Sequence, residues 1–126
     1  MNVLEDYECD GQMELSKDVL VWIKEPGYVI YPKRVPNTLE ALQEIVGGYV
    51  EELGMCTDLR ILCNEEAILG DYIFNVSIAG AQLFGNLIIV KIDEEGEIVD
   101  FDQEDTIRRL IPQLFEGKTK AAEGEA

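Results

Sequence analysis

A dense group of carboxylates is the part of this sequence best equipped to do chemistry. Eight acidic residues, and no Lys or Arg, occur between positions 93 and 105 of the 126-residue chain. Carboxylates at this density attract cations or basic protein surfaces, and they repel nucleic acid and anionic membranes. We therefore expect a basic protein partner, with no direct binding of nucleic acid and no membrane association. The candidate partner-binding residues are Asp93, Glu94, Glu95, Glu97, Asp100, Asp102, Glu104 and Asp105.

The spacing of these acids half-fits a calcium-binding loop. Asp93, Glu95, Glu97 and Glu104 stand at positions one, three, five and twelve of an EF-hand loop. Position six, where that motif needs Gly, is Ile98. The pattern therefore favours a solvated hairpin and helix start, with weak and screened cation binding, over a dedicated site. We expect no bound metal and no cofactor.

The charge of the whole chain permits a second interpretation of the same residues. The formal net charge is −16 and the sequence pI is about 4.1. Carboxylates arrayed on a sheet edge and a helix can occupy a basic groove that normally takes phosphates. The acidic face is thus either a mimic of nucleic acid toward a basic partner or a solvated surface with no DNA-related role.

Groups suited to catalysis are scarce. The chain has no His, and Cys9, Cys56 and Cys63 form no CxxC pair, so a mixed zinc site and a Cys–His pair are both excluded. The segment 64–66 (Asn-Glu-Glu), together with Asp71, is either a carboxylate pair or a polar turn. We favour the turn, because paired carboxylates need a shifted pKa that only burial or a close charge provides. We expect a non-enzymatic protein.

One mixture of aromatic and basic side chains stands near the N-terminal end of the domain. Trp22, Tyr28 and Tyr31 occur near Lys24, Lys33 and Arg34. Such a mixture can stack a nucleotide or a base, although a hairpin with one core face and one solvated face has the same composition. The alternative function is therefore binding or sequestering a small molecule or nucleotide, with Trp22, Tyr31 and Asn75 as candidate ligand-binding residues.

Composition indicates a single domain that positions these groups. Residues 18–116 form the expected domain, between an acidic N-terminal arm at 1–17 and a small, polar, flexible tail at 117–126. A hydrophobic fraction of 47% is typical of a globular protein. No apolar run approaches the roughly 18 residues of a membrane span, and the N-terminus does not resemble a secretory signal. A cytoplasmic location is the expectation.

Alternating apolar residues predict the strands of this domain. The strands are expected at 19–24, 28–34, 59–63, 72–78, 86–92 and 97–101. The first two are joined by Glu25-Pro26-Gly27-Tyr28, which suits a type II turn because Pro presets φ and Gly accepts a positive φ. After Gly47-Gly48, either a strand begins at Tyr49 or a helix continues through Leu53.

Two helices complete the expected architecture. Asn37 is the expected cap of the first, which Gly47-Gly48 should end. The second begins near 102–105, whose acids supply a cap, and Pro112 should kink or shorten it. We predict an α+β fold in which two helices pack on a five- or six-stranded antiparallel or mixed sheet. The expected core comprises Val19, Val21, Ile23, Leu39, Leu42, Ile45, Val46, Leu59, Ile61, Ile88, Val90, Ile107, Leu110 and Leu114.

Three stretches of the chain resemble a known family. They are NTLEALQEIVGGYVEE at 37–52, ILCNEEAIL at 61–69 and GNLIIV at 85–90. Over about 19–90 the sequence resembles the bacterial and phage family catalogued as domain of unknown function 3846. Members often carry Leu-Pro-x-Asn-Arg where this chain has Ile73-Phe74-Asn75-Val76, so a ligand role for that Arg does not transfer. The resemblance implies occurrence in Gram-positive gut bacteria, their phages and conjugative elements, and it brings no catalytic residues.

Overall fold

The computed structural model of the chain describes residues 18–56, 58–66 and 72–118. The acidic arm expected at 1–17, Asp71 of the possible carboxylate pair, and residues 119–126 of the tail expected at 117–126 lie outside the described residues. At the start of that tail, the amide of Lys118 donates to the carbonyl of Gly27 at 2.9 Å. Residues 18–118 form the expected α+β arrangement, in which helices pack on a mostly antiparallel sheet.

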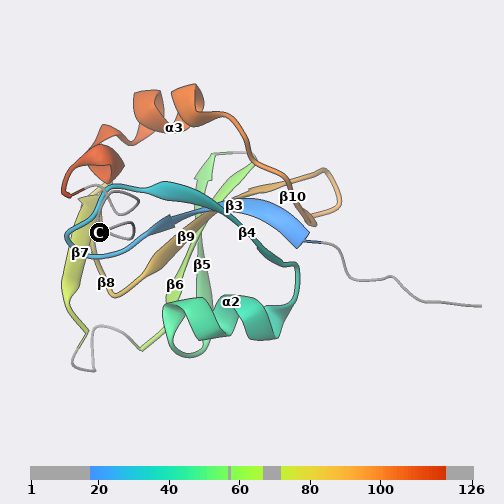
Figure 1. Cartoon of the computed structure of the whole chain (residues 1–126), viewed down its shortest axis with the longest axis horizontal. Coiled ribbons are helices and arrows are strands. Elements are labelled where there is room, and N and C mark those ends of the chain that lie inside the picture. The colour runs from blue at the N-terminus through green and yellow to red at the C-terminus, as the bar shows by residue number, and fades with distance from the viewer. Residues whose placement is uncertain (1–17, 57, 67–71, 119–126) are drawn as a thin grey trace, which may run out of the picture.

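A six-stranded antiparallel sheet forms the centre of the molecule (Figure 1). Its path is β4-β3-β9-β6-β5, and β10 pairs with the outer end of β9. A separate hairpin, β7–β8, stands beside it, and two α-helices and one 3₁₀ turn complete the described chain. The elements are β3 (Asp18–Lys24), β4 (Tyr31–Pro36), α2 (Leu39–Val46), β5 (Val50–Cys56), β6 (Leu59–Asn64), β7 (Phe74–Ile78), β8 (Ala81–Phe84), β9 (Leu87–Ile92), β10 (Ile98–Val99), α3 (Glu104–Leu110) and η1 (Pro112–Phe115).

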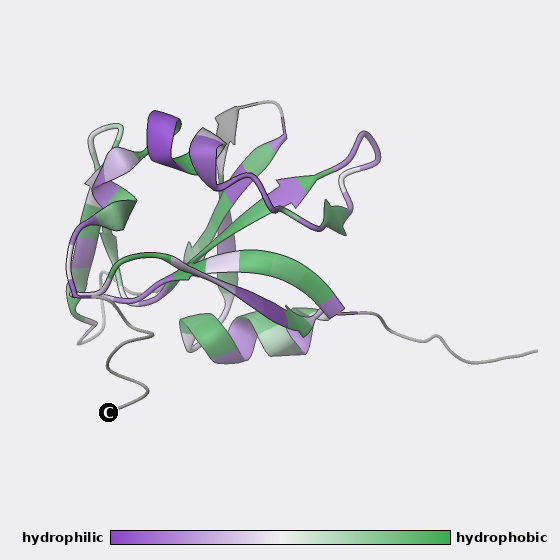
Figure 2. Ribbon diagram, turned by 45° about the horizontal axis from the view of Figure 1, so that its top comes forward, coloured by the Kyte–Doolittle hydropathy of each residue, from purple (hydrophilic) through white to green (hydrophobic). Residues whose placement is uncertain are grey.

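Side chains alternate between two cores because successive residues of a strand point to opposite faces of the sheet. On one face α2 covers a core that includes Val21, Leu42 and Ile88. On the other face α3, η1 and the β7–β8 hairpin cover Trp22, Ile61 and Ile89. Figure 2 shows the hydrophobic residues gathered in the strands of the large sheet, whereas α3 is mainly hydrophilic.

The turn between the first two strands is as expected, but the second strand starts later. The amide of Tyr28 donates to the carbonyl of Glu25 at 3.1 Å, and Gly27 has a φ of 86°. The next two amides then pair with the C-terminal segment, since Val29 donates to Lys118 and Ile30 to Leu114. The strand predicted at 28–34 is therefore wrong at its start, and β4 begins at Tyr31.

Helix α2 begins one residue later than expected and ends where expected. The hydroxyl of Thr38, not the side chain of Asn37, accepts the amide of Ala41 at 3.1 Å and caps the helix. Asn37 instead donates to the carbonyl of Ile98. Gly47 ends the helix with a left-handed φ of 85°. Strand β5 then begins at Val50, so of the two alternatives for this segment the strand is the one that forms.

The hairpin β7–β8 was not predicted as two strands. Its turn is formed by Ala79 and Gly80, both with positive φ, as a tight hairpin turn requires. Ala rarely adopts a positive φ, so the residue types at this turn do not identify it. The strand expected at 72–78 is shorter, and β8 follows it directly.

The C-terminal elements differ from the expectation in three respects. The strand expected at 97–101 is reduced to β10, and no side-chain hydrogen bond caps α3, whose N-cap is Gln103. Pro112 opens the short helix η1, where its missing amide is tolerated. Leu39 and Leu110, expected in the core, are 59% and 46% exposed. Helical periodicity predicts which face of a helix a side chain lies on, but it does not predict whether the sheet extends far enough to cover that side chain. No helix of the described part of the chain is long and apolar enough to cross a membrane.

Candidate functional site

A cavity lies where α2 ends. The left-handed Gly47 turns the chain away from the helix, and Gly48 and Tyr49 lead back into β5. Between this turn and the end of β6 a cavity of about 540 Å³ opens. Ligand sites in proteins commonly have volumes of roughly 300–1,000 Å³. Its lining residues are Gln43, Gly47, Gly48, Tyr49, Asn64, Glu66 and Tyr72.

The buried amide of Asn64 holds the wall of this cavity together. Its Nδ2 donates to the carbonyl of Val46 at 3.2 Å and to the hydroxyl of Tyr72 at 2.8 Å. Its Oδ1 accepts the amide of Glu66 at 2.7 Å. The Tyr72 hydroxyl in turn donates to the carbonyl of Gly47 at 3.0 Å. One side chain therefore ties the end of α2, the exit of β6 and the segment before β7.

Two glycines allow the close packing of this wall. A Cβ on Gly48 would lie 2.6 Å from Asn64 Nδ2, closer than side chains pack. A Cβ on Gly85, which also has a positive φ of 76°, would lie 2.8 Å from Cδ2 of Tyr72. The Tyr72 ring thus lies directly against the Gly85 backbone. Tyr72 and Gly47 also line a second cavity of about 430 Å³.

The three stretches that carry the family resemblance meet at these two cavities. Gly47 and Gly48 come from the first stretch, Asn64 and Glu66 from the second, and Gly85 and Asn86 from the third. Asn86 Nδ2 also donates to the carbonyl of Ile45 at the end of α2. The expectation of a polar turn at 64–66 fits what is described, because Asn64 is engaged in backbone contacts and Glu65 and Glu66 are exposed.

Sequence reasoning missed Gln43, Tyr49 and Tyr72 as lining residues. Gln43 was part of a helix and Tyr72 the start of a strand, and nothing in either pattern indicates a shared cavity. One signal was present, namely two adjacent glycines between a helix and a strand, because such a pair lets other groups approach the backbone closely.

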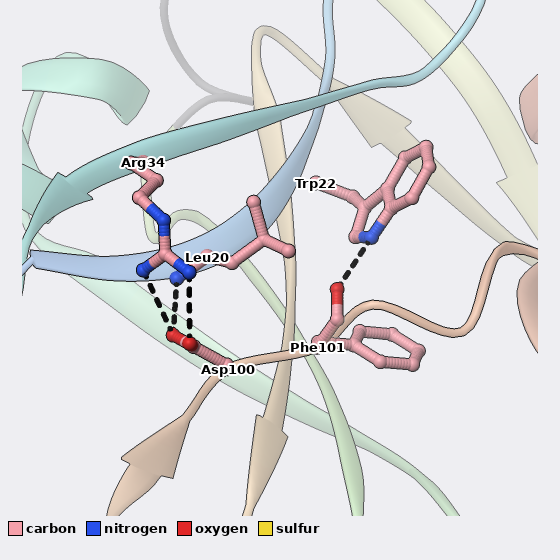
Figure 3. Close-up of polar contacts among 5 residues, drawn as sticks. All are labelled: Leu20, Trp22, Arg34, Asp100 and Phe101. Carbon is pink, nitrogen blue, oxygen red and sulfur yellow. Dashed lines mark hydrogen bonds and ion pairs between the residues drawn. The ribbon is translucent and has the colours of Figure 1, made fainter.

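The three candidate ligand-binding residues do not line one pocket. Trp22 is 5% exposed, and its indole Nε1 donates to the carbonyl of Phe101 at 2.7 Å, which makes it a core residue (Figure 3). Tyr31 packs on the opposite face of the sheet, where its hydroxyl donates to Glu25 Oε2 at 2.8 Å. Burial, followed by this hydrogen bond, raises the pKa of Tyr31. A stacking site made of these two aromatic rings is therefore excluded.

Asn75, the third candidate, forms hydrogen bonds with Lys24 at the end of β3 and with Gly85. Its Nδ2 donates to the carbonyls of Lys24 and Gly85, at 2.9 and 2.7 Å. Its Oδ1 accepts from Nζ of Lys24 at 2.9 Å, and that buried ammonium also donates to the carbonyl of Glu25. Burial lowers the pKa of Lys24, against the opposing charge of Glu116. These contacts join the β7–β8 hairpin to the large sheet.

Three of the eight candidate acids support the local fold. Asp93 Oδ1 accepts the amides of Glu95 and Glu97, each at 2.9 Å, and closes the β9–β10 hairpin. Asp100 accepts the amide of Leu20 and pairs with Arg34 at 3.0 Å (Figure 3). The hydrogen bond from Arg34, together with that of the Leu20 amide, lowers the pKa of Asp100. Glu104 pairs with Arg108 one turn along α3.

The side chains of the other five acids are exposed and make no hydrogen bond or ion pair within the described ranges. Three lie on the β9–β10 turn, Asp102 lies between β10 and α3, and Asp105 lies in the first turn of α3. The chain runs from that turn through β10 to α3 (Figure 1). We call Glu94, Glu95, Glu97, Asp102 and Asp105 the acidic face. Among the residues that the structure describes, no group of three or more His, Cys, Asp or Glu side chains is placed to hold a metal ion. The segment 93–104, which carries the partial calcium-loop pattern, forms a hairpin turn, β10 and the start of α3.

Comparison with known proteins places the chain in a family by its sequence. Residues 18–114 match the family described as Domain of unknown function (DUF3846). This match covers the whole large sheet, both α-helices and most of η1. No curated protein and no solved structure matches the chain.

Proposed function

Because the chain belongs to the DUF3846 family, whose description assigns no activity, we propose a function from its surface: it is a non-enzymatic module whose acidic face binds a basic partner protein. One observation supports the proposal most directly. Asp93, Asp100 and Glu104 bond other parts of the fold, whereas the carboxylates of the acidic face are exposed and make no such contact within the described residues. Charges that serve no structural purpose are the ones available to a partner.

The acidic face is presented on backbone that is fixed in place. Asp93 closes the turn that carries Glu94, Glu95 and Glu97. Asp100 ties the following segment to Leu20 in the sheet, and the amide of Phe101 bonds the carbonyl of Leu20 at 3.0 Å. A face held in this way loses little conformational entropy on binding, which favours affinity.

Basic residues close to the acidic face do not neutralise it. Arg34 pairs with Asp100, and Arg108 pairs with Glu104 and stacks over Phe115 at 4.0 Å. With a net charge of −16, the protein attracts a basic surface from a distance and speeds the encounter. We propose a partner whose basic groove ordinarily takes phosphates, because rows of carboxylates resemble that charge pattern.

We propose a binding role rather than a catalytic one because of the side chains that the protein has. The sequence has no His to act as a base. Cys63 is buried, its Sγ faces the carbonyl of Glu51, and burial raises the pKa of its thiol. Nucleophilic cysteines need the opposite shift, toward the thiolate.

The test compares two variants of equal charge. One replaces Glu94, Glu95 and Glu97 by Gln and Asp102 by Asn, which removes four charges from the acidic face. The control replaces Glu40, Glu52 and Glu65 by Gln and Asp58 by Asn, which removes four exposed charges elsewhere. Each tagged protein is incubated with a native cell lysate at about 0.1 M and about 1 M salt, between which the Debye length falls from ~10 to ~3 Å.

We expect the wild type and the control to retain the same basic protein at low salt, with duplex DNA displacing it. The acidic-face variant should retain it far less, and high salt should release it from all three proteins. Equal recovery with the acidic-face variant and the control at low salt, or a recovery by the wild type that high salt does not reduce, contradicts the proposal and leaves the carboxylates as a solvated surface.

A further inference from the structure

We infer that the cavity of about 540 Å³ between the end of α2 and Tyr72 binds a small organic cation, a molecule with an amine or guanidinium group on a short apolar body. The inference does not rest on the acidic face, because none of the residues lining this cavity belongs to the segment 93–105. It rests on the rings, the charges and the hydrogen bonds of the cavity wall.

Two tyrosine rings line the cavity. Tyr49 is 68% exposed, so most of its side chain is open to a ligand. Tyr72 is 36% exposed, and its hydroxyl is already engaged by Gly47 and Asn64. What Tyr72 offers to a ligand is therefore its ring rather than its hydroxyl. Aromatic faces attract ammonium and guanidinium groups, most strongly where water is excluded.

The charges around the cavity select for a positive ligand. Glu66 contributes an exposed carboxylate that makes no ion pair within the described residues. None of the described residues that line this cavity or the cavity of about 430 Å³ is Lys or Arg. The C-terminal end of α2 opens at the same place, and the peptide dipoles of a helix make that end negative. An anion such as a nucleotide would meet repulsion here without any compensating group.

Several polar groups in the described part of the wall are already engaged without a ligand. Both donors of the Asn64 amide and the hydroxyl proton of Tyr72 are used within the protein. The amides of Gly47 and Gly48 both donate to the carbonyl of Gln43. The carboxylate of Glu66, the side-chain amide of Gln43 and the tyrosine rings are left for the ligand. A ligand recognised in this way needs positive charge and a modest apolar surface.

The experiment uses probes that differ in charge and that each carry a planar polar head on a short alkyl chain. Butylguanidinium, the neutral butylurea and the anion butyrate are titrated into the ¹⁵N-labelled protein while backbone amide shifts are followed by NMR. Butylguanidinium should shift the amides of Gly47, Gly48, Tyr49 and Glu66, while butylurea and butyrate leave them in place. Equal binding of butylurea or of butyrate overturns the inference.

Matched variants separate this cavity from general attraction to an acidic protein. Glu66→Gln and Glu94→Gln each remove one negative charge, but only Glu66 lines the cavity. Glu66→Gln and Tyr49→Ala should each weaken butylguanidinium binding about tenfold, which corresponds to about 1.4 kcal/mol, and Glu94→Gln should leave it unchanged. Equal weakening by Glu66→Gln and Glu94→Gln, or shifts centred on 93–105, would overturn the cavity as the site.

A last titration tests whether the cation is a free small molecule or an arginine side chain of another protein. A capped Gly-Arg-Gly peptide carries the same guanidinium on a backbone that the cavity must accommodate. Weaker binding of the peptide than of butylguanidinium supports a free small molecule. Tighter binding of the peptide would assign the cavity to an arginine side chain of a partner and refute the inference as stated. Because this site and the acidic face are tested by different variants, each can fail alone.

Discussion

At the scale of single residues, Asn64 is the side chain on which most of the cavity wall depends. It bonds the helix end, the exit of its own strand and Tyr72. A buried amide with both donors satisfied is stable, whereas one that loses a partner costs about 1–3 kcal/mol. Changes that displace Asn64 should therefore disturb several elements together.

Gly48→Ala is the sharpest test of that dependence. Its Cβ would lie 2.6 Å from Asn64 Nδ2, so the amide must move and its bonds lengthen. We expect a loss of about 1–3 kcal/mol in the free energy of unfolding, measured by urea titration. Gly54→Ala is the control, because nothing lies within 4 Å of a Cβ there, and it should change stability by less than about 0.5 kcal/mol. Equal effects of the two substitutions would show that the wall yields freely.

The Asp100 carboxylate should give the stability of the protein a dependence on acid. Its pKa is lowered in the folded state by the hydrogen bonds from Arg34 and the Leu20 amide. Stability from such a group is present above the unfolded-state pKa, about 3.9 for Asp, and is lost as the pH falls through the lower folded value. Asp100→Asn should thus destabilise the protein at pH 7, and the difference from the wild type should shrink in acid.

Urea titrations across the acid range measure this difference. Asp102→Asn serves as the control, since that nearby carboxylate makes no hydrogen bond within the described residues. Its profile should run parallel to the wild type. If Asp100→Asn has the same dependence of stability on pH as the wild type, the ion pair with Arg34 and the hydrogen bond from Leu20 are not maintained in solution.

At the scale of elements, the cap of α2 distinguishes two neighbouring residues. Thr38 accepts the amide of Ala41, whereas Asn37 bonds the carbonyl of Ile98. Thr38→Ala should cost about 1 kcal/mol, in the usual range for a lost cap, and should lower the thermal midpoint. Asn37→Ala removes one exposed bond and should cost under about 0.5 kcal/mol. A larger loss with Asn37→Ala would restore Asn37 as the cap.

The elements that could be predicted are those with a strong local pattern. The first strand and its turn, the stripe of α2 ended by Gly47, and the apolar run of β9 all lie close to where alternation or helical spacing places them. The β7–β8 hairpin was missed because Ala79 takes a positive φ that residue type does not announce. Residues 28–30 look like a strand, but the amides of Val29 and Ile30 bond the C-terminal segment, and no local window contains that partner.

The candidate site was less accessible to prediction than the fold. The cavity wall unites the end of α2, the exit of β6 and Tyr72, and only the sheet order brings them together. Trp22 and Tyr31 are close in the sequence but pack on opposite faces of the sheet. For the acids the density was visible at once, yet which of them serve the fold depends on the positions of Leu20 and Arg34.

At the scale of the whole molecule, charge repulsion should limit stability. A net charge of −16 on this small chain destabilises the compact state, and salt screens that repulsion. Raising NaCl from about 0.01 to about 0.5 M should therefore raise the thermal midpoint followed by circular dichroism. The same salt weakens the exposed Arg34–Asp100 pair, but exposed pairs contribute little.

The variant with four charges removed from the acidic face provides the comparison. With less repulsion to screen, its midpoint should start higher at low salt and rise less. A midpoint that falls with salt in the wild type would mean that attractive pairs outweigh repulsion in this fold.

The position of β9 in the sheet determines when the domain can fold during its synthesis. The neighbouring strands β3–β4 and β5–β6 form two local hairpins, and β9 alone joins them in the large sheet. An isolated hairpin is marginally stable in water. During synthesis, the two hairpins cannot be joined in one sheet until residues 87–92 leave the ribosome. The core under α2 can close then, whereas the core under α3 also needs Phe101, Ile107, Ile111 and Leu114. The nascent chain thus depends on its late segment, and a ribosome that stalls before Leu87 exposes two apolar faces to the chaperones of the cell.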